Sequence, residues 1–439
     1  MDLGNGVAPV GAPVTSTSAT TSVFASVPEA PQDPILGLNE LFREDPSPHK
    51  VNLGVGAYRT DENRPYVLGV VKRIEQEMAA DTATVHEYLP IEGWPEFRRL
   101  SAHLVFGADA PALREERVVT LQSLSGTGSL RVVAEFLAHF YRPGTVCCIP
   151  QPTWGNHKNI FPRAGLPVRE YRYYDDANRG LDYDGMVEDL EAAPTGSIVV
   201  LHACAHNPTG ADPDMQQWQG VLEVVRRRRH FPLFDCAYQG FASGSFERDA
   251  AAIRLFAAAT PPLEMAVTQS FAKNMGLYGE RVGALHVVCA EAAVTRAVMS
   301  QLKQVARAMY SSPPGHGAAI VTRVLRDPAL FAEWETEVQV MSGRIMRMRR
   351  ELHQALQENG TPGNWGHVLT QIGMFSFTGL SASQCLYLRE RYYIYMTSNG
   401  RISMAGLTSD KVRYLADAMK DAVLHAGKDG GSGGMAPKI

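Results

Sequence analysis

The strongest constraint on the fold is a series of short apolar runs that alternate with helical segments between residues 117 and 289. Most runs are apolar at nearly every position, which is typical of strands buried on both faces of a sheet. Because helical segments lie between many of them, we expect an α/β fold with a mostly parallel, seven-stranded sheet wrapped by helices. The predicted strands are 117–121, 145–149, 168–173, 198–202, 232–236, 265–269 and 284–289.

A second block of predicted elements follows the sheet. It consists of a helix at 328–358, a strand at 374–377, a helix from Ser381, a short strand near 393–395 and a helix at 409–425. This order predicts a smaller α+β domain, which part of the segment 35–80 is expected to join. The predicted division is a disordered extension at 1–27, an arm and part of the small domain at 28–65, a large domain at 66–335, the small domain at 336–426 and a flexible Gly-rich tail at 427–439.

Composition and charge exclude several classes of protein. The chain has 439 residues, of which 45% are hydrophobic and 20% charged, as expected of a globular protein with two domains. Its net charge of -4 gives no basic footprint for nucleic acid, and no apolar run is long enough to span a membrane. Residues 1–27 lack lysine and arginine, unlike a mitochondrial presequence or a secretory signal, so we expect a cytoplasmic protein. The six cysteines form no CxxC pair, which predicts neither a metal site nor a disulfide scaffold.

The stretch from Ser270 to Arg281 carries the first indication of chemistry. Lys273 follows a predicted buried strand, and a buried lysine loses its proton easily because desolvation disfavours the ammonium. A neutral amine forms an imine with an aldehyde, and an arginine such as Arg281 is suited to gripping a phosphate. An aldehyde that carries a phosphate is pyridoxal phosphate. Taken alone, the stretch also fits a surface lysine beside an ordinary surface arginine.

Polar or aromatic residues also follow other predicted strands, where ligands bind in parallel sheets. Ser125-Gly126-Thr127 opens a helix, so its backbone N–H groups and hydroxyls form either an anion site or a plain helix cap. Trp154 is placed to stack on a flat ring, although a rim aromatic is an equal alternative. Asn207, in an Asn-Pro turn, brings an amide to the same edge of the sheet.

Asp235 and Tyr238 complete this set of residues at the strand ends. An aspartate that ends an apolar strand is costly unless it is paired, and a protonated pyridinium nitrogen would pair with it. Tyr238 follows three residues later and is placed to hydrogen-bond the phenolic oxygen of the same ring. Each signal is weak alone, but together they match the needs of one cofactor.

With these motifs, the chain resembles the aspartate aminotransferases from about Phe24 to about Leu424. The motifs occur in the family's order at 51–59, 86–90, 125–127, 202–210, 235–244 and 270–283. The resemblance implies a pyridoxal phosphate enzyme of fold type I. It also implies a homodimer with two shared active sites and small-molecule amino and keto acids as substrates.

The resemblance assigns roles around the cofactor. Lys273 would hold it as an imine and move a proton, while Asp235 would keep the ring nitrogen protonated. Tyr238 and Asn207 would bond the ring oxygen, and Trp154 would stack on the ring. His157 and His202 would support the aspartate, or would be ordinary core histidines. The implied phosphate ligands are Ser125, Gly126, Thr127, Ser270, Arg281 and Tyr88 of the partner subunit.

Two arginines indicate the substrate. By the resemblance, Arg401 clamps the α-carboxylate and the partner subunit's Arg307 the distal one, because an arginine fork grips a planar carboxylate at two points. This pair favours ping-pong transfer of an amino group from L-aspartate to 2-oxoglutarate, giving oxaloacetate and L-glutamate. The other implied substrate-binding residues are Gly56, Trp154 and Asn207.

One departure from the family lies close to the distal arginine. The chain has Ser311-Ser312-Pro313-Pro314, where the family usually has Ser-Asn-Pro-Pro. A broad-specificity or aromatic aminotransferase on the same scaffold is therefore an alternative. A non-catalytic paralogue is a second alternative, against which the intact Lys273, Asp235, Arg281 and Arg401 argue.

Overall fold

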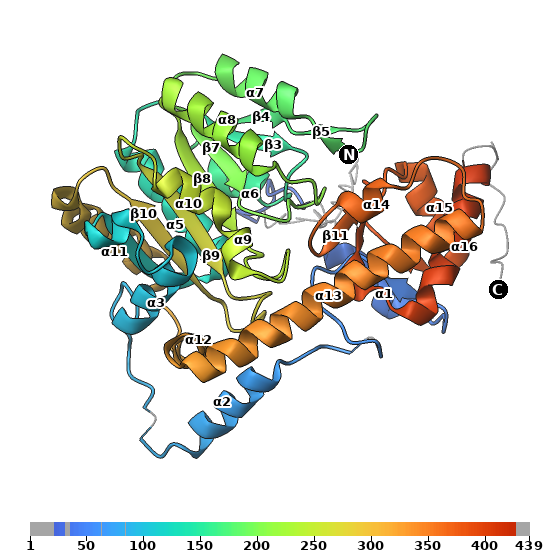
Figure 1. Ribbon diagram of the computed structural model, residues 1–439, viewed down its shortest axis with the longest axis horizontal. Helices are drawn as coiled ribbons and strands as arrows, with labels where there is room; N and C mark the ends of the chain where they lie inside the picture. Colours follow the sequence, from blue (N-terminus) through green and yellow to red (C-terminus); the bar gives the residue numbers. More distant parts are fainter. Residues whose placement is uncertain (1–21, 31–35, 63, 84, 427–439) are drawn as a thin grey trace, which may run out of the picture.

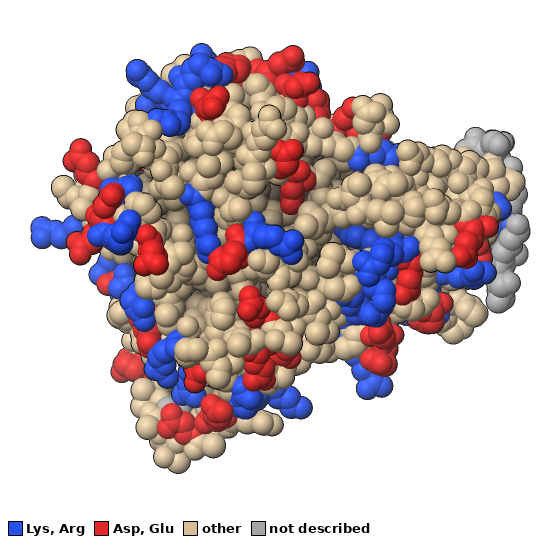
Figure 2. Space-filling view, in the orientation of Figure 1, with Lys and Arg blue, Asp and Glu red and all other residues tan. Residues whose placement is uncertain are grey.

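The computed structural model describes residues 22–30, 36–62, 64–83 and 85–426 (Figure 1). Most of the predicted extension at 1–27, part of the predicted arm at 28–65 and the whole tail at 427–439 lie outside these residues. Among the described residues, no helix is long and apolar enough to cross a bilayer. Figure 2 shows acidic and basic side chains interspersed over one face of the molecule.

A seven-stranded sheet forms the centre of the larger part of the molecule, as predicted. All its neighbouring strands are parallel except β10, which runs antiparallel to both β2 and β9. In spatial order the strands are β2 (Val118–Leu124), β10 (Val282–Val288), β9 (Met265–Ser270), β8 (Phe231–Cys236), β7 (Ile198–His202), β3 (Cys147–Gln151) and β4 (Val168–Arg172). The predicted α/β fold class is thus confirmed.

Helices cover both faces of this sheet, which explains why its strands read as continuous apolar runs. Along β7, Val199 and Leu201 pack in one core with α3, α7, α8 and α10, whereas Ile198 and Val200 pack in another with α5, α6 and α11. The bounds are α3 Pro95–Phe106, α5 Ser125–Phe140, α6 His157–Arg163, α7 Tyr183–Ala192, α8 Met215–Arg227, α10 Ala251–Ala257 and α11 Thr295–Tyr310.

Helix α5 begins at Ser125, where the sequence Ser125-Gly126-Thr127 is expected to open a helix. Its first turn contains Gly126 and Gly128, which lower intrinsic helix propensity. Tertiary contacts decide the matter, because Ser125 and Gly126 are buried. The helix therefore starts directly at the end of β2, and its N-terminus faces the edge of the sheet where a ligand is expected.

The C-terminal elements pack beside the sheet, together with the early α1 (Figure 1). The long helix α13 spans Pro328–Glu358 as predicted, and β1 pairs in parallel with β12. The domain boundaries themselves remain a prediction. The other elements here are α1 Leu36–Glu44, β1 Val51–Asn52, α14 His367–Thr370, β11 Phe375–Phe377, α15 Ala382–Tyr392, β12 Ile394–Tyr395, β13 Arg401–Ser403, η2 Met404–Gly406 and α16 Ser409–His425.

Short elements complete the described chain. They are α2 Gly69–Ala80, α4 Pro111–Arg114, β5 Tyr174–Asp175, β6 Gly180–Leu181, α9 Phe246–Asp249, η1 Ala292–Val294 and α12 His316–Arg326.

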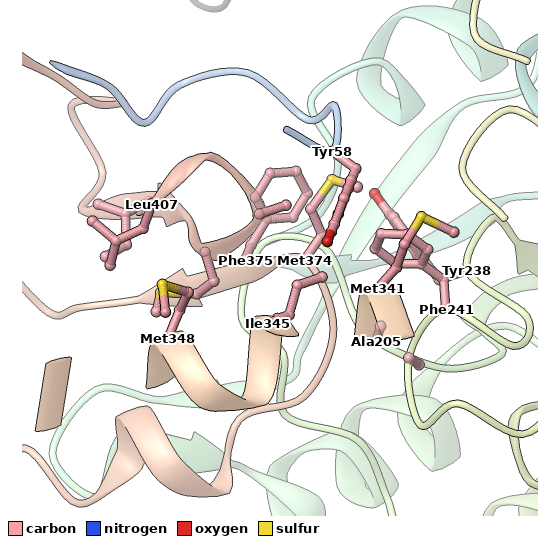
Figure 3. Close-up of a cluster of buried hydrophobic side chains, with 14 of the residues drawn as sticks. Tyr58, Ala205, Tyr238, Phe241, Met341, Ile345, Met348, Met374, Phe375 and Leu407 are labelled. Atoms are coloured by element: carbon pink, nitrogen blue, oxygen red, sulfur yellow. The ribbon is translucent and has the colours of Figure 1, made fainter. Parts of the chain in front are cut away.

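A third hydrophobic core joins the C-terminal elements to loops at the sheet edge. Figure 3 shows Met341 and Ile345 of α13 in this core, near Phe375 of β11 and Tyr238, which follows β8. This packing brings β11 and β13 to the carboxyl ends of the sheet strands.

Candidate active site

A cavity of about 200 Å³ lies at the carboxyl ends of the parallel strands. It is lined by twelve of the predicted site residues, which come from segments far apart in the chain. These are Gly56, Ser125, Gly126, Thr127, Trp154, Asn207, Asp235, Tyr238, Ser270, Lys273, Arg281 and Arg401. Leu130, His202, Ala237, Ala272 and Phe375 complete the lining.

Lys273 presents its amine beside an aromatic ring in this cavity. Its Nζ lies 5.2 Å from the centre of the Tyr238 ring. Burial lowers the pKa of Lys273, and the positive charge of Arg281 acts in the same direction, although Asp235 opposes them. Burial also raises the pKa of Tyr238, so its phenol stays protonated. The cavity therefore favours a neutral, nucleophilic amine beside a neutral phenol.

A directed chain of hydrogen bonds reaches Asp235 from the loop after β7. The backbone N–H of Asn207 donates to Nδ1 of His202 across 3.2 Å, which leaves the His202 proton on Nε2. This Nε2 lies 3.2 Å from Oγ1 of Thr153, which lies 2.8 Å from Nδ1 of His157. The Thr153 hydroxyl accepts from His202 and donates to His157, whose Nε2–H then donates to Oδ2 of Asp235 across 3.2 Å.

This series of hydrogen bonds determines the charge on the Asp235 side chain, and Asp235 is 8% exposed. Burial raises the pKa of its carboxyl, but the hydrogen bond from His157, together with smaller electrostatic interactions with His157, His202 and Lys273, outweighs burial. The net pKa of Asp235 lies below its ordinary value, so the carboxylate is anionic at neutral pH. Burial also holds the pKa of His202 well below its usual range, which keeps this histidine neutral.

Hydroxyls and a helix N-terminus form the opposite end of the cavity. Ser125, Gly126 and Thr127 make up the first turn of α5, and Oγ of Ser125 lies 2.8 Å from Oγ of Ser270 at the end of β9. The exposed guanidinium of Arg281 donates to the carbonyl of Tyr278 across 2.9 Å, and no described carboxylate pairs with it. Free backbone N–H groups, hydroxyls and an arginine together suit a phosphate.

Arg401 of β13 provides a second cationic group, which is 4% exposed. Its Nη2 donates to the carbonyl of Gly54 across 2.8 Å and its Nη1 to Oδ1 of Asn207 across 3.3 Å. Its guanidinium carbon lies 4.1 Å from the centre of the Phe375 ring, and burial lowers its pKa to about 10. Nε is buried without a hydrogen-bond partner, and no described carboxylate pairs with the side chain. A buried, unpaired guanidinium is an apt site for a carboxylate.

Two predicted residues lie away from this cavity in the single chain. Tyr88 is 81% exposed and lies in a groove with the segment 312–316. Arg307 is an exposed residue of α11 that hydrogen-bonds Ser311. The resemblance placed both in the neighbouring subunit's site, so their roles remain predictions.

Three contributors escaped the sequence patterns. Thr153 links two histidines, the carbonyl of Gly54 holds Arg401, and Phe375 stacks on that arginine. A threonine in a turn and a backbone carbonyl carry no sequence signal of such roles. Phe375 sits in an apolar strand, where it is indistinguishable from a core residue.

Known proteins resemble this chain over most of its length. Residues 48–419 match the model of the family described as aminotransferase class I and II. The cytoplasmic aspartate aminotransferase of Oryza sativa subsp. japonica is 57% identical over 405 residues, which cover 92% of this chain and 99% of that protein. The solved aspartate aminotransferase from Saccharomyces cerevisiae cytoplasm has a TM-score of 0.89 at 41% identity and covers 92% of this chain and 98% of its own. The aromatic-amino-acid aminotransferase from Burkholderia pseudomallei, covalently bound to pyridoxal phosphate, has a TM-score of 0.88 at 44% identity, with coverages of 92% and 100%.

Proposed function

The chain belongs to the class I and II aminotransferases, and we propose that it is an aspartate aminotransferase, transferring an amino group between L-aspartate and 2-oxoglutarate. The products are oxaloacetate and L-glutamate. The single observation that carries this proposal is the presence of Lys273, Asp235 and the unpaired Arg401 in one cavity. The first two suit amino-group chemistry, and the third suits the carboxylate that every amino acid carries.

The donors around the cavity fit pyridoxal phosphate. Lys273 suits its aldehyde, Asp235 its ring nitrogen, and the first turn of α5 with Ser270 and Arg281 its phosphate. Asn207 and Tyr238 suit the ring oxygen, and Trp154 offers a flat surface. When bound, the cofactor would supply a carbonyl that bonds to the substrate's nitrogen and a ring that withdraws electrons from the substrate Cα.

Within this site, the chain's own residues move one proton and hold two others in place. The amine of Lys273, with its lowered pKa, would take the proton from the substrate Cα and return it to the cofactor's aldehyde carbon, on the other side of the nitrogen. Asp235 stays anionic and holds a proton on the ring nitrogen, because His157 donates to its carboxylate. Tyr238 keeps its own proton and donates it as a hydrogen bond, since burial raises its pKa.

Arginines orient the substrate in this proposal. Arg401 is already fixed by Gly54 and Asn207, so gripping the α-carboxylate requires little ordering. The partner subunit's Arg307 would grip the distal carboxylate, which selects diacids. Gly56 leaves room beside Arg401 and Phe375, because a Cβ atom at position 56 would lie 3.0 Å from Cζ of Phe375.

A homodimer is part of the same proposal. The groove around Tyr88 has a volume of about 640 Å³ and is lined by Val85, Trp94 and the segment 312–316 among others. The exposed apolar side chains of Val85 and Trp94 suit a second copy of the chain. Light scattering from a chromatographic peak should give twice the chain mass of 48.0 kDa.

We also propose a cytoplasmic location, although curated relatives carry cytoplasmic, chloroplastic and mitochondrial names. Cell fractionation tests this location.

An aromatic or broad-specificity aminotransferase is the second candidate. Ser312 favours it, because the resemblance places asparagine there, and solved relatives with such names are as similar as those named for aspartate. An amino-donor panel with 2-oxoglutarate as acceptor separates the candidates. We expect kcat/KM to be higher for aspartate than for tyrosine, and an equal or higher value for tyrosine would overturn the aspartate assignment.

A further inference from the structure

The anion-binding end of the cavity is assembled from two strands that are not neighbours. Ser125 follows β2 and Ser270 ends β9, while β10 lies between these strands in the sheet. The two serine hydroxyl oxygens are nevertheless 2.8 Å apart. The chain at Ser125 must therefore pass over β10, and β10 must leave room for it.

Gly283 of β10 is the residue at this crossing. It pairs with Ser123 of β2 on one side and with Ser270 of β9 on the other. A Cβ atom at position 283 would lie 2.7 Å from Cα and 2.9 Å from the carbonyl carbon of Ser125, and 2.3 Å from the carbonyl oxygen of Gln269. All three are backbone atoms, so no side-chain rotation relieves the overlap. Even one methyl group at Gly283 would push the segments that contain Ser125 and Gln269 away from β10.

Two buried serines hold Ser125 in the conformation that the crossing needs. Ser125 has φ of +60°, a left-handed conformation that is disfavoured for residues other than glycine. Its carbonyl oxygen lies 3.0 Å from Oγ of Ser129 and 3.3 Å from Oγ of Ser123, and these two hydroxyls also contact each other, so their two protons serve three hydrogen-bond contacts. A hydrogen bond from a serine hydroxyl, such as that of Ser129, to the carbonyl four residues earlier is common in helices. Ser123, in contrast, lies on β2 and thus ties the start of the helix to the sheet.

We propose that Gly283, assisted by Ser123 and Ser129, is a positioning residue that keeps the phosphate end of the site assembled before any ligand arrives. None of the three lines the cavity. Preassembled donors bind an anion without an ordering cost at the moment of binding, so affinity for the phosphate depends on residues that never touch it. The inference rests on the proposed function, since it takes the anion to be the cofactor's phosphate.

Gly283→Ala tests this inference through binding rather than turnover. Dissociation constants of the cofactor-free protein are measured for pyridoxal phosphate and for pyridoxal, which lacks the phosphate. We expect binding of pyridoxal phosphate to weaken about tenfold or more and binding of pyridoxal to change less than about twofold. The matched control is Gly343→Ala on α13, where a Cβ atom meets nothing within 4 Å, and it should change neither constant. Equal weakening of both ligands, or no weakening, overturns the inference.

Alanine at both Ser123 and Ser129 provides a second test, which decides the matter if Gly283→Ala does not fold. We expect a smaller loss, about two- to fivefold, again confined to pyridoxal phosphate. An unchanged affinity in this double variant then overturns the inference. Failure of the unmodified protein to bind pyridoxal phosphate would instead overturn the proposed function, so the two failures are distinguishable.

Discussion

Nε2 of His157 lies 3.2 Å from Oδ2 of Asp235, and this hydrogen bond joins the cavity to the buried residues behind it. His157 is fully buried, and Trp154 packs edge-on against it with ring centres 5.3 Å apart. The same histidine therefore supports both the carboxylate proposed for the ring nitrogen and the aromatic ring proposed to stack on the cofactor.

His157→Leu should shift the acid limb of the pH–rate profile upward. The pKa of Asp235 is depressed in the folded protein, so its anionic form is lost as pH falls through that pKa, and removing the donor raises the pKa. Hydrogen bonds to charged groups contribute roughly 1.5–3 kcal/mol, or about 1–2 pH units. The measurement is kcat/KM for aspartate between acid and neutral pH. An acid limb that does not move would exclude His157 as the group that keeps Asp235 ionised.

Thr153→Val should produce a weaker version of the same shift. Valine preserves the shape of threonine but removes the hydroxyl between His202 and His157, which leaves the His157 ring less firmly oriented. We expect an upward movement of about half a pH unit, because one neutral hydrogen bond contributes roughly 1 kcal/mol or less. Thr153→Ser retains the hydroxyl and should restore the original profile. A shift as large in the serine variant would show that the methyl group matters rather than the hydrogen bond.

Lys273→Ala should separate cofactor binding from catalysis. The variant retains Asp235 and the residues proposed to bind the phosphate, so it should bind pyridoxal phosphate, but borohydride should no longer fix the cofactor to the protein. Turnover should fall by a factor of about 10⁴ or more, because general base catalysis alone contributes 10²–10⁴. Mass spectrometry after reduction and single-turnover absorbance measure the two effects. Substantial residual transamination would mean that another residue moves the proton.

The sequence predicts the strands well and the direction of one of them not at all. All seven predicted runs are strands of the central sheet, because burial on both faces leaves a continuous apolar pattern. The same pattern is silent about direction, so nothing in Val282–Val288 indicates that β10 is antiparallel. The predicted strands 117–121 and 284–289 also stop before the end of the β2–β10 ladder, which continues to the pair Leu124 and Val282.

The candidate site follows a similar division. Side chains such as Lys273 and Asp235 are recognisable because their chemistry is unusual at the end of an apolar strand. The contacts of Arg401 with Gly54, 347 residues away, and with Phe375 on the paired strand β11 are not, because they depend on how these segments pack together. Sequence patterns thus predict which groups take part, whereas packing decides how each group is oriented.

Glu337→Ala should destabilise the fold without altering catalysis directly. Glu337 of α13 accepts hydrogen bonds from the backbone N–H groups of Gly69 at 2.6 Å and Val70 at 3.1 Å, and so caps α2 from another helix. Losing a helix cap costs about 1 kcal/mol in the free energy of unfolding. Urea unfolding measures this loss, and the control is Glu335→Ala on the same helix, because the Glu335 side chain makes no hydrogen bond or ion pair with the part of the chain that the structure describes. Equal stabilities of the two variants would contradict the capping role.

Arg307→Ala should change substrate choice more than overall competence. In the proposed dimer this arginine grips only the distal carboxylate, so kcat/KM should fall about 10- to 150-fold for aspartate, since charge-assisted hydrogen bonds contribute roughly 1.5–3 kcal/mol. The amino donor L-alanine has no distal carboxylate, so the variant should react with it at an unchanged rate. Arg401→Ala is the contrasting variant, because its unpaired guanidinium is the proposed grip on the α-carboxylate, and it should impair both substrates equally. Equal losses for aspartate and alanine in Arg307→Ala would assign that arginine to structure, and selectivity for diacids would then have to come from a residue inside the single-chain cavity.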